Sequence, residues 1–363
     1  MRKENWTYKK LGEVAYYPSK RIATKDLKSF SFVGVENLIK NKGGVSFSES
    51  LPNIDTAIEY QKDDILIGNI RPYLKKIWKA DNNGGASGDV VIVRINKEYA
   101  CLLDAKYLYK VLSTDYFFDY DNSNTKGAKM PRGDRKVIAK YIIPIPPLST
   151  QSRIVSELDL LQSIIDKQKT QLKELDNLAQ SIFYDVFGDP VENEKGWEVK
   201  KFGELFKLKS GDGLSTKSFV EGNVPVYGGN GISGYHNKSN KHGKYIIIGR
   251  VGVYCGNSRY VNDTFWLTDN AFELIFSDKL FDYRWLNTLL NSLNLTQYAN
   301  HAAQPVISNT GLKDIVVIHP PLSLQQSFAQ KIESIERQKE LINQSIREAQ
   351  TLFDSRMEYY FGE

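Results

Sequence analysis

Cysteine, histidine and long hydrophobic runs are all scarce in this chain of 363 residues. The two cysteines, Cys101 and Cys255, are too few for a disulfide framework or a cysteine-based zinc site, and we interpret both as reduced packing residues. The four histidines have no metal-ligand spacing. No run approaches the roughly 18 apolar residues of a membrane helix, and Met1 is not followed by a signal-peptide core. We therefore expect a cytoplasmic protein without membrane contact.

Catalytic and nucleotide-binding motifs are also absent from the sequence. It contains no Gly-x-x-x-x-Gly-Lys-Ser/Thr phosphate loop and no Pro-Asp dipeptide of the common nuclease signature. A DNA methyltransferase would need a glycine-rich cofactor loop and an Asn/Asp-Pro-Pro-aromatic or Pro-Cys element, and neither is present. The sequence therefore predicts a protein that binds but does not catalyse, and that carries no cofactor or metal of its own.

The sequence contains two copies of one unit. Pro-Pro-Leu-Ser-Thr-Gln at 146–151 recurs as Pro-Pro-Leu-Ser-Leu-Gln at 320–325, and this offset of 174 persists to Phe-Gly at 361–362. Trp-x-x-Lys-Lys-Leu-Gly-Glu at 6–13 recurs with Phe for Leu at 197–204, an offset of 191. Between these anchors the offset is 181, at Ile67 and Ile248. The repeat therefore joins two copies of a scaffold whose middle sections differ.

A heptad pattern follows each Pro-Pro-Leu-Ser string. Apolar residues recur in alternating steps of four and three, which is typical of a coiled-coil seam. We predict two long helices that pair as an antiparallel coiled coil, with Gln168 and Lys339 as polar layers that fix the register. The alternative is that each helix packs only on its own lobe. The predicted seam consists of Ile154, Leu158, Leu161, Ile165, Gln168, Leu172, Leu175, Phe328, Ile332, Ile335, Lys339, Ile342 and Ile346.

The segments outside these helices are predicted to mix strands with short helices. Apolar runs predict strands at 65–67, 90–93, 245–248, 272–275 and 315–318, and periodic segments predict helices at 105–112 and 283–293. Glycine- and asparagine-rich strings predict loops at 82–85 and 227–231. The expected fold class is α+β with a pseudo-twofold internal repeat. The expected boundaries are a lobe at 1–143, a helix at 144–190, a lobe at 191–317 and a helix at 318–363.

Positive charge is concentrated in the lobes. The net charge is +8 over residues 1–140 and +2 over 191–320, whereas the two helical segments carry −3 and −2. This division favours lobes that contact a polyanion and helices that contact protein.

Basic, amide and aromatic residues near the predicted loops are the candidates for contact with DNA. The alternative is that each cluster is a solvated surface or a plain turn. The candidates in the first lobe are Lys20, Arg21, Asn69, Arg71, Tyr73, Lys75, Ser87, Lys126, Lys129 and Arg132. Those in the second lobe are Lys209, Ser210, Tyr227, Asn230, Arg250, Asn257, Asn270 and Gln304.

The tandem order of these elements resembles the DNA specificity subunit of type I restriction-modification systems. The resemblance covers the whole chain and is carried by the Trp-x-x-Lys-Lys-Leu/Phe-Gly-Glu strings, residues 64–72 and 87–90, and Pro-Pro-Leu-Ser before each helix. It implies that each lobe is a target recognition domain for one half-site of double-stranded DNA. It also implies that the helices space the lobes and dock two methyltransferase subunits. Those partners would carry S-adenosylmethionine, and a translocating restriction subunit would join only the complete complex.

Two other interpretations remain open. The chain could be the specificity subunit of a related system whose partner fuses methyltransferase and nuclease, or a coiled-coil protein adaptor with two peptide-binding lobes. Salt separates the DNA-binding interpretations from the adaptor, because DNA binding should weaken steeply with added salt whereas an adaptor would not bind duplex DNA.

Overall fold

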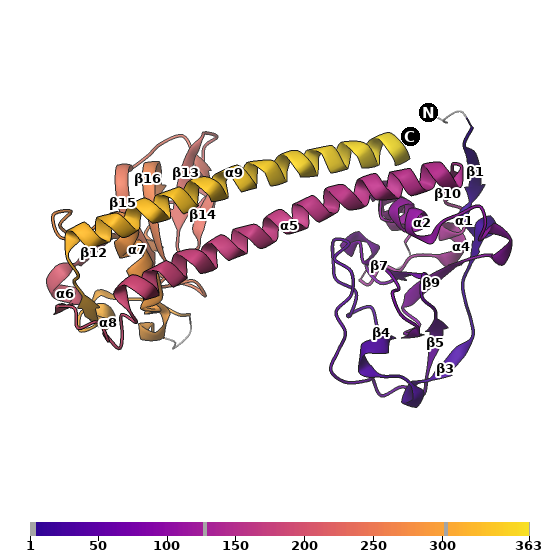
Figure 1. Cartoon of the computed structure of the whole chain (residues 1–363), viewed down its shortest axis with the longest axis horizontal. Helices are drawn as coiled ribbons and strands as arrows, with labels where there is room; N and C mark the ends of the chain where they lie inside the picture. Colours follow the sequence, from indigo (N-terminus) through magenta and orange to yellow (C-terminus); the bar gives the residue numbers. More distant parts are fainter. Residues whose placement is uncertain (1–4, 126–128, 301–303, 363) are drawn as a thin grey trace. The chain divides into compact units, whose positions relative to one another are not determined.

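The computed structural model describes residues 5–125, 129–300 and 304–362, which fold as two compact units (Figure 1). Unit 1 comprises the described residues among 1–167 and 346–363, and unit 2 comprises 168–345. The long helices α5 (Leu148–Phe187) and α9 (Leu322–Phe361) each contribute to both units. Each unit thus contains one lobe together with one segment of α5 and one of α9.

Unit 1 is built around two four-stranded sheets. The strand order is β2 (Ala15–Tyr16), β9 (Val90–Ile95), β6 (Ile65–Gly68), β7 (Ile77–Lys79) in one sheet and β3 (Arg21–Ala23), β5 (Thr56–Tyr60), β8 (Gly84–Ala86), β4 (Phe32–Val33) in the other. Ile65, Ile67 and Val91 belong to the core formed with the helices, whereas Leu66 and Ile92 belong to a core formed with the second sheet. Burial on both faces explains the uninterrupted apolar runs that predicted β6 and β9.

Unit 2 contains one six-stranded sheet, covered on one face by a helix. The strand order is β12 (Lys207–Ser210), β17 (Ala271–Ile275), β15 (Lys241–Gly249), β16 (Ser258–Leu267), β13 (Val224–Gly228), β14 (Gly231–His236), and only the β13–β16 pair is parallel. Ile246 and Ile248 pack with Trp285 and Leu289 of helix α7 (Tyr283–Ser292), while Ile247 packs in a separate cluster on the other side.

The other elements are short and recur in both units. Helix α2 (Ala105–Leu112) corresponds to α7, and both confirm the predicted helices. Two antiparallel pairs precede the long helices, β1 (Thr7–Lys10) with β10 (Ile142–Ile145), and β11 (Val199–Lys201) with β18 (Val316–Ile318). The remaining α-helices are α1 (Leu11–Val14), α3 (Asp115–Ser123), α4 (Arg135–Ile138), α6 (Phe202–Leu205) and α8 (Asn309–Leu312). The 3-10 helices are η1 (Thr24–Asp26), η2 (Ser29–Ser31), η3 (Pro72–Leu74), η4 (Lys97–Tyr99), η5 (Thr216–Ser218) and η6 (Leu295–Tyr298).

The glutamine of the first Pro-Pro-Leu-Ser-x-Gln string ties α5 to its lobe. Gln151 Oε1 accepts the backbone N–H of Asp104 at 2.9 Å, and its Nε2 donates to the carbonyls of Leu102 and Pro146, both at 2.7 Å. The side chain of Asp104 in turn caps the start of α2. Gln151 is wholly buried, so its amide serves as an internal connector between the two helices.

Gln325 repeats this arrangement in unit 2. Its Oε1 accepts the N–H of Asp282 at 3.0 Å, and its Nε2 donates to the carbonyls of Leu280 at 3.1 Å and Pro320 at 2.9 Å. Asp282 caps α7 as Asp104 caps α2. The repeated string therefore encodes a repeated three-bond joint at the start of each long helix.

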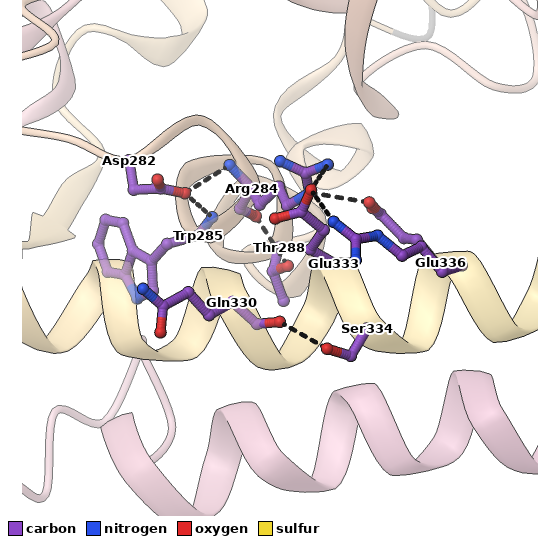
Figure 2. Close-up of polar contacts among 9 residues, drawn as sticks. Asp282, Arg284, Trp285, Thr288, Gln330, Glu333, Ser334 and Glu336 are labelled. Carbon is purple, nitrogen blue, oxygen red and sulfur yellow. Dashed lines mark hydrogen bonds and ion pairs between the residues drawn. The ribbon is translucent and has the colours of Figure 1, made fainter.

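Charged side chains also hold α7 against α9 within unit 2 (Figure 2). The Nε of Arg284 lies 2.8 Å from Glu336 Oε2, and its Nη2 lies 3.8 Å from Glu333 Oε1. The guanidinium also covers the Tyr260 ring, 5.1 Å from the ring centroid. These contacts fix the orientation of α7 on α9.

The long helices contact one another inside each unit. In unit 1, Arg356 Nε lies 2.8 Å from Glu157 Oε1, and the Tyr360 hydroxyl donates to Glu157 Oε2 at 2.6 Å. In unit 2, Gln168 donates to the Ser345 hydroxyl and Lys339 forms an ion pair with Asp176.

The position of these contacts shows the direction of the segments in unit 2. Residue 168 meets 345, 176 meets 339, and the rings of Phe187 and Phe328 lie 5.6 Å apart, so the two segments run antiparallel. Every residue of the predicted seam is buried or partly buried. A continuous coiled coil over the full length of both helices stays a prediction.

Three expectations about local structure were wrong. Cys101 is exposed, because Leu103 rather than Cys101 fills the core before α2. Gly84 and Gly85 form strand β8 instead of a loop, in a position so tight that a Cβ on Gly84 would come within 2.0 Å of a backbone oxygen. The predicted loop at 227–231 is a hairpin whose turn contains only residues 229 and 230.

Candidate nucleic-acid interface

Several first-lobe candidates, among them Asn69, Arg71 and Arg132, lie where β6 leaves the sheet. Gly68 ends the strand, and Ile70 then forms an isolated bridge with Arg132. The N–H of Arg71 donates to the carbonyl of Pro131 at 2.7 Å. Two segments far apart in the sequence therefore meet at this strand end and bring Arg71 and Arg132 together.

The second lobe repeats this junction where β15 ends. Val251 forms an isolated bridge with Val306, and the N–H of Gly252 donates to the carbonyl of Pro305 at 3.0 Å. Position 252 corresponds to 71, and 305 to 131, by the sequence offsets of 181 and 174. The two lobes thus present the same backbone junction with different side chains.

Arg71 and Lys75 occupy an unusual backbone conformation. They flank η3, and both are left-handed, with φ of +54° and +49°. The corresponding Gly252 and Gly256 have φ of +90° and +89°. The left-handed conformation costs a residue with a Cβ about 1–2 kcal/mol, so glycine is the least strained residue at both positions. The first lobe instead holds two cations there, and strain of this kind concentrates at functional sites.

Most other first-lobe cations already have a partner inside the lobe. The contacts are Lys20 with Glu59 at 2.7 Å, Lys75 with Asp115 at 2.9 Å, Arg132 with Asp89 at 3.1 Å, and Arg21 with the Thr56 hydroxyl at 2.8 Å. Exposed pairs contribute about 0–1 kcal/mol each, so a phosphate can compete for these cations. Arg71 is exposed and makes no ion pair among the described residues.

The remaining first-lobe candidates differ in exposure. Tyr73 is 50% exposed and Lys129 is exposed, whereas Asn69 and Ser87 are partly buried. Lys126 lies outside the described residues. Arg71, Tyr73 and Lys129 are therefore the first-lobe candidates that are exposed and whose side chains make no ion pair or hydrogen bond with the described residues.

A buried carboxylate lies beneath this surface. Asp121 of α3 is 1% exposed, and burial raises its pKa to about 6. A Cβ on Gly133 would come within 2.5 Å of Asp121 Oδ1 and 2.9 Å of Asn69 Oδ1, so these side chains meet below the segment that carries Arg132. Asp121 Oδ2 and Asn69 Oδ1 have no hydrogen-bond partner among the described residues. The junction thus rests on polar atoms that are costly to bury.

Protonation of Asp121 should consequently stabilise unit 1 as the pH falls. Because burial raises the pKa of Asp121, the folded state holds the proton more tightly than the unfolded state. The cost of the buried carboxylate, about 2–3 kcal/mol, applies fully above about pH 6 and disappears between about pH 6 and about pH 4. Asp121→Asn should therefore unfold at a higher temperature than the parent near neutral pH, and this advantage should shrink as the pH falls. Asp119→Asn, an exposed position on the same helix, is the control, and an Asp121→Asn advantage independent of pH would contradict the assignment.

Three second-lobe candidates line a cavity of about 680 Å³ beside the β13–β14 turn. Asn230, Asn270 and Gln304 contribute to its wall, together with Thr268, which is 3% exposed and whose hydroxyl has no partner among the described residues. The lining residues carry no charged side chain. Amide groups on an uncharged wall suit hydrogen bonding to base edges rather than to phosphates.

The other second-lobe candidates lie on or near the strands. The Arg250 guanidinium covers the Phe272 ring at 5.4 Å, and Tyr227 packs its ring on Phe265 at 5.3 Å. Burial raises the pKa of the Tyr227 hydroxyl. Lys209, Ser210 and Asn257 are exposed, and the Ser210 hydroxyl donates to the carbonyl of Asp269 at 3.4 Å. Tyr227 is thus a packing residue as much as a candidate contact.

Tyr254 and Val253 were missed by the sequence reasoning. Tyr254 is 50% exposed and Val253 80% exposed, on the loop that follows the junction of the second lobe. The repeat offset of 181 places Tyr254 at the position of Tyr73, and this signal was present in the sequence.

Metal and membrane sites are not found in the part of the chain that the structure describes. Its His, Cys, Asp and Glu side chains form no group of three or more suited to a metal ion. None of its helices combines the length and hydrophobicity needed to cross a bilayer.

Comparison with known proteins identifies the family. The family model for the type I restriction modification DNA specificity domain matches residues 3–177 and 194–351. The type I restriction enzyme EcoprrI specificity subunit of Escherichia coli is 26% identical over 247 residues, which cover 64% of this chain but only 61% of that subunit.

Two solved structures share the fold. The type I restriction-modification S subunit from M. genitalium matches with a TM-score of 0.63 and 15% identity over 97% of this chain and 95% of its own. A chain from the structure describing complex assembly and conformational transition of the type I R-M system matches with a TM-score of 0.61 and 19% identity, over 99% and 98%. These matches confirm the expected α+β class with two copies of a mixed lobe, and the relative named above is a specificity subunit. This chain therefore belongs to the type I restriction-modification DNA specificity family.

Proposed function

We propose that this chain is the non-catalytic subunit that selects the DNA target of a type I restriction-modification complex, with each lobe reading one half of a bipartite site. The observation that supports this most strongly is the repeated strand-end junction. Its backbone is the same in both lobes, but Arg71 and Lys75 in one lobe correspond to Gly252 and Gly256 in the other. One scaffold with two different contact surfaces suits two different half-sites.

Each lobe contacts both phosphates and bases, but through different residues. In the first lobe, exposed cations such as Lys20, Lys129 and Arg132 hold phosphates, and Arg71 reads a base edge in the major groove. In the second lobe, where the net charge is only +2, the amide-lined cavity carries more of the base reading. The target recognition domains are residues 1–143 and 191–317, and the function places the chain in the cytoplasm with the DNA that it reads.

The long helices, within 144–190 and 318–363, dock two methyltransferase subunits. Their outward faces expose large apolar side chains, at Leu160, Leu178, Leu341, Leu352 and Tyr359, each at least 46% exposed. Exposed apolar side chains of this size are available for burial in a contact with another protein. The partners bind S-adenosylmethionine and methylate an adenine in each half-site, and a translocating restriction subunit joins the assembled complex.

A map of methylated adenines tests this function. DNA from cells that express the chain with its neighbouring methyltransferase should show a split methylation motif that is absent when the chain is missing. Affinity of the complex for a duplex with this motif should fall steeply with salt, because released counterions contribute much of the binding. An unchanged map with methyltransferase that still copurifies would refute the function and favour a protein adaptor.

A further inference from the structure

Residues 71–75 and 252–256 form the same short loop in the two lobes, and we refer to them as the tyrosine loops. In the first, the N–H of Leu74 donates to the carbonyl of Arg71 at 2.9 Å. In the second, the N–H of Cys255 donates to the carbonyl of Gly252 at 3.0 Å. Each loop begins and ends with a residue of positive φ.

The base of each tyrosine loop is closed in the same way. The N–H of Gly68 donates to the carbonyl of Lys76 at 3.0 Å, and the N–H of Gly249 donates to the carbonyl of Asn257 at 3.0 Å. Together with the matching Pro131 and Pro305 contacts, these bonds fix both loops in one conformation. The equivalence therefore lies in the backbone and does not depend on similar side chains.

Only the central residue is identical in the two tyrosine loops. The first reads Arg-Pro-Tyr-Leu-Lys and the second Gly-Val-Tyr-Cys-Gly. Tyr73 and Tyr254 are each 50% exposed. Both rings are therefore accessible to a ligand, and their identity at the centre of two otherwise different loops points to a contact that the two lobes share.

We propose that Tyr73 and Tyr254 are matched, sequence-independent DNA contacts, one in each half-site, whose rings pack on a deoxyribose of the DNA backbone. This inference rests on the proposed function. Residues that discriminate bases must differ between lobes that read different half-sites, whereas a docking contact can be the same in both. Packing on the backbone serves this purpose because every nucleotide presents the same sugar. The residues at the two ends of each loop differ. In the first lobe they are cations, and in the second they are glycines, which allow the backbone to approach the DNA closely.

The test is DNA affinity of tyrosine variants in the complex of the full chain with its methyltransferase. Tyr73→Ala and Tyr254→Ala should each weaken binding about 10-fold, on the target duplex and on duplexes with either half-site scrambled, because a contact to the sugar does not depend on sequence. Tyr73→Phe and Tyr254→Phe should bind normally, since the ring remains. Tyr235→Ala, 56% exposed elsewhere in the second lobe, is the matched control.

Photocrosslinking locates the contacts directly. Duplexes that carry 5-iodouracil in one half-site should crosslink to Tyr73, and duplexes labelled in the other half-site should crosslink to Tyr254, as identified by mass spectrometry. The inference is overturned if the Ala variants bind DNA normally, or if they lose the methyltransferase while the isolated chain keeps its DNA affinity. Failure of the parent complex to bind any duplex would instead refute the proposed function itself.

Discussion

Replacing Gln151 with alanine is expected to lower the free energy of unfolding of unit 1 by about 4 kcal/mol. The substitution removes three hydrogen bonds from a side chain with no solvent exposure. It leaves the N–H of Asp104 and the carbonyls of Leu102 and Pro146 without their partner, and each buried unpaired group costs about 1–3 kcal/mol. The lost side-chain volume adds a cavity at the start of α5.

The repeat supplies a matched experiment for this joint. Gln325→Ala should cause a similar loss in unit 2, whereas the exposed Gln350→Ala and Gln330→Ala should change stability by less than about 0.5 kcal/mol. Hydrogen exchange separates the units, because Gln151→Ala should speed exchange in α2 and Gln325→Ala in α7. Equal acceleration in both helices from either variant would show that the joints do not act within separate units.

Replacing Arg71 with alanine is expected to weaken recognition of one half-site about 30-fold, or about 2 kcal/mol, and to leave the other intact. The reason is that Arg71 is exposed, free of ion pairs among the described residues, and held in a strained conformation that glycine occupies in the second lobe. Arg71→Gly should cause the same loss of recognition. It should nevertheless raise the stability of unit 1 by up to about 1 kcal/mol, because glycine relieves the left-handed strain.

Because Arg71→Gly should lower DNA affinity while raising the free energy of unfolding, the two measurements together distinguish a role in recognition from a role in folding. Binding is measured on duplexes in which one half-site at a time is altered, and stability by denaturant unfolding of the same proteins. Lys20→Ala is the control for a phosphate contact and should weaken all duplexes by a similar, smaller factor. Equal loss at both half-sites in Arg71→Ala would contradict separate readers, and a destabilised Arg71→Gly would contradict the role of strain.

Elements with strong local patterns were predictable from the sequence. The helix predicted at 105–112 matches α2 in both bounds, because apolar residues recur at helical spacing behind an aspartate cap. Strand β16 was missed because its exposed and buried residues do not alternate regularly. Helix α3 was missed because its aromatic and acidic residues lack a clear period, and the Thr114 cap together with the burial of Phe117 and Phe118 holds it in place.

The candidate site was only partly predictable, because its electrostatics depend on tertiary contacts. Sequence patterns identified Arg71, Lys75 and Arg132 as cations near loops. They did not reveal that Lys75 pairs with Asp115 and Arg132 with Asp89, since each partner lies about 40 residues away. The left-handed conformation of Arg71 could not be predicted from the sequence either, since no neighbouring residue type requires it.

The division of both long helices between the units has a consequence for folding during synthesis. Unit 2 is one continuous stretch, 168–345, so all its contacts can form once the ribosome has passed that stretch. Unit 1 needs the segment from 346 onward, where Tyr360 reaches its core and bonds Glu157, across a separation of 203 residues. Closing such a loop is entropically costly and kinetically slow. The lobe that is translated first is therefore expected to complete its fold last, and until then it exposes the apolar face of α5 to chaperones.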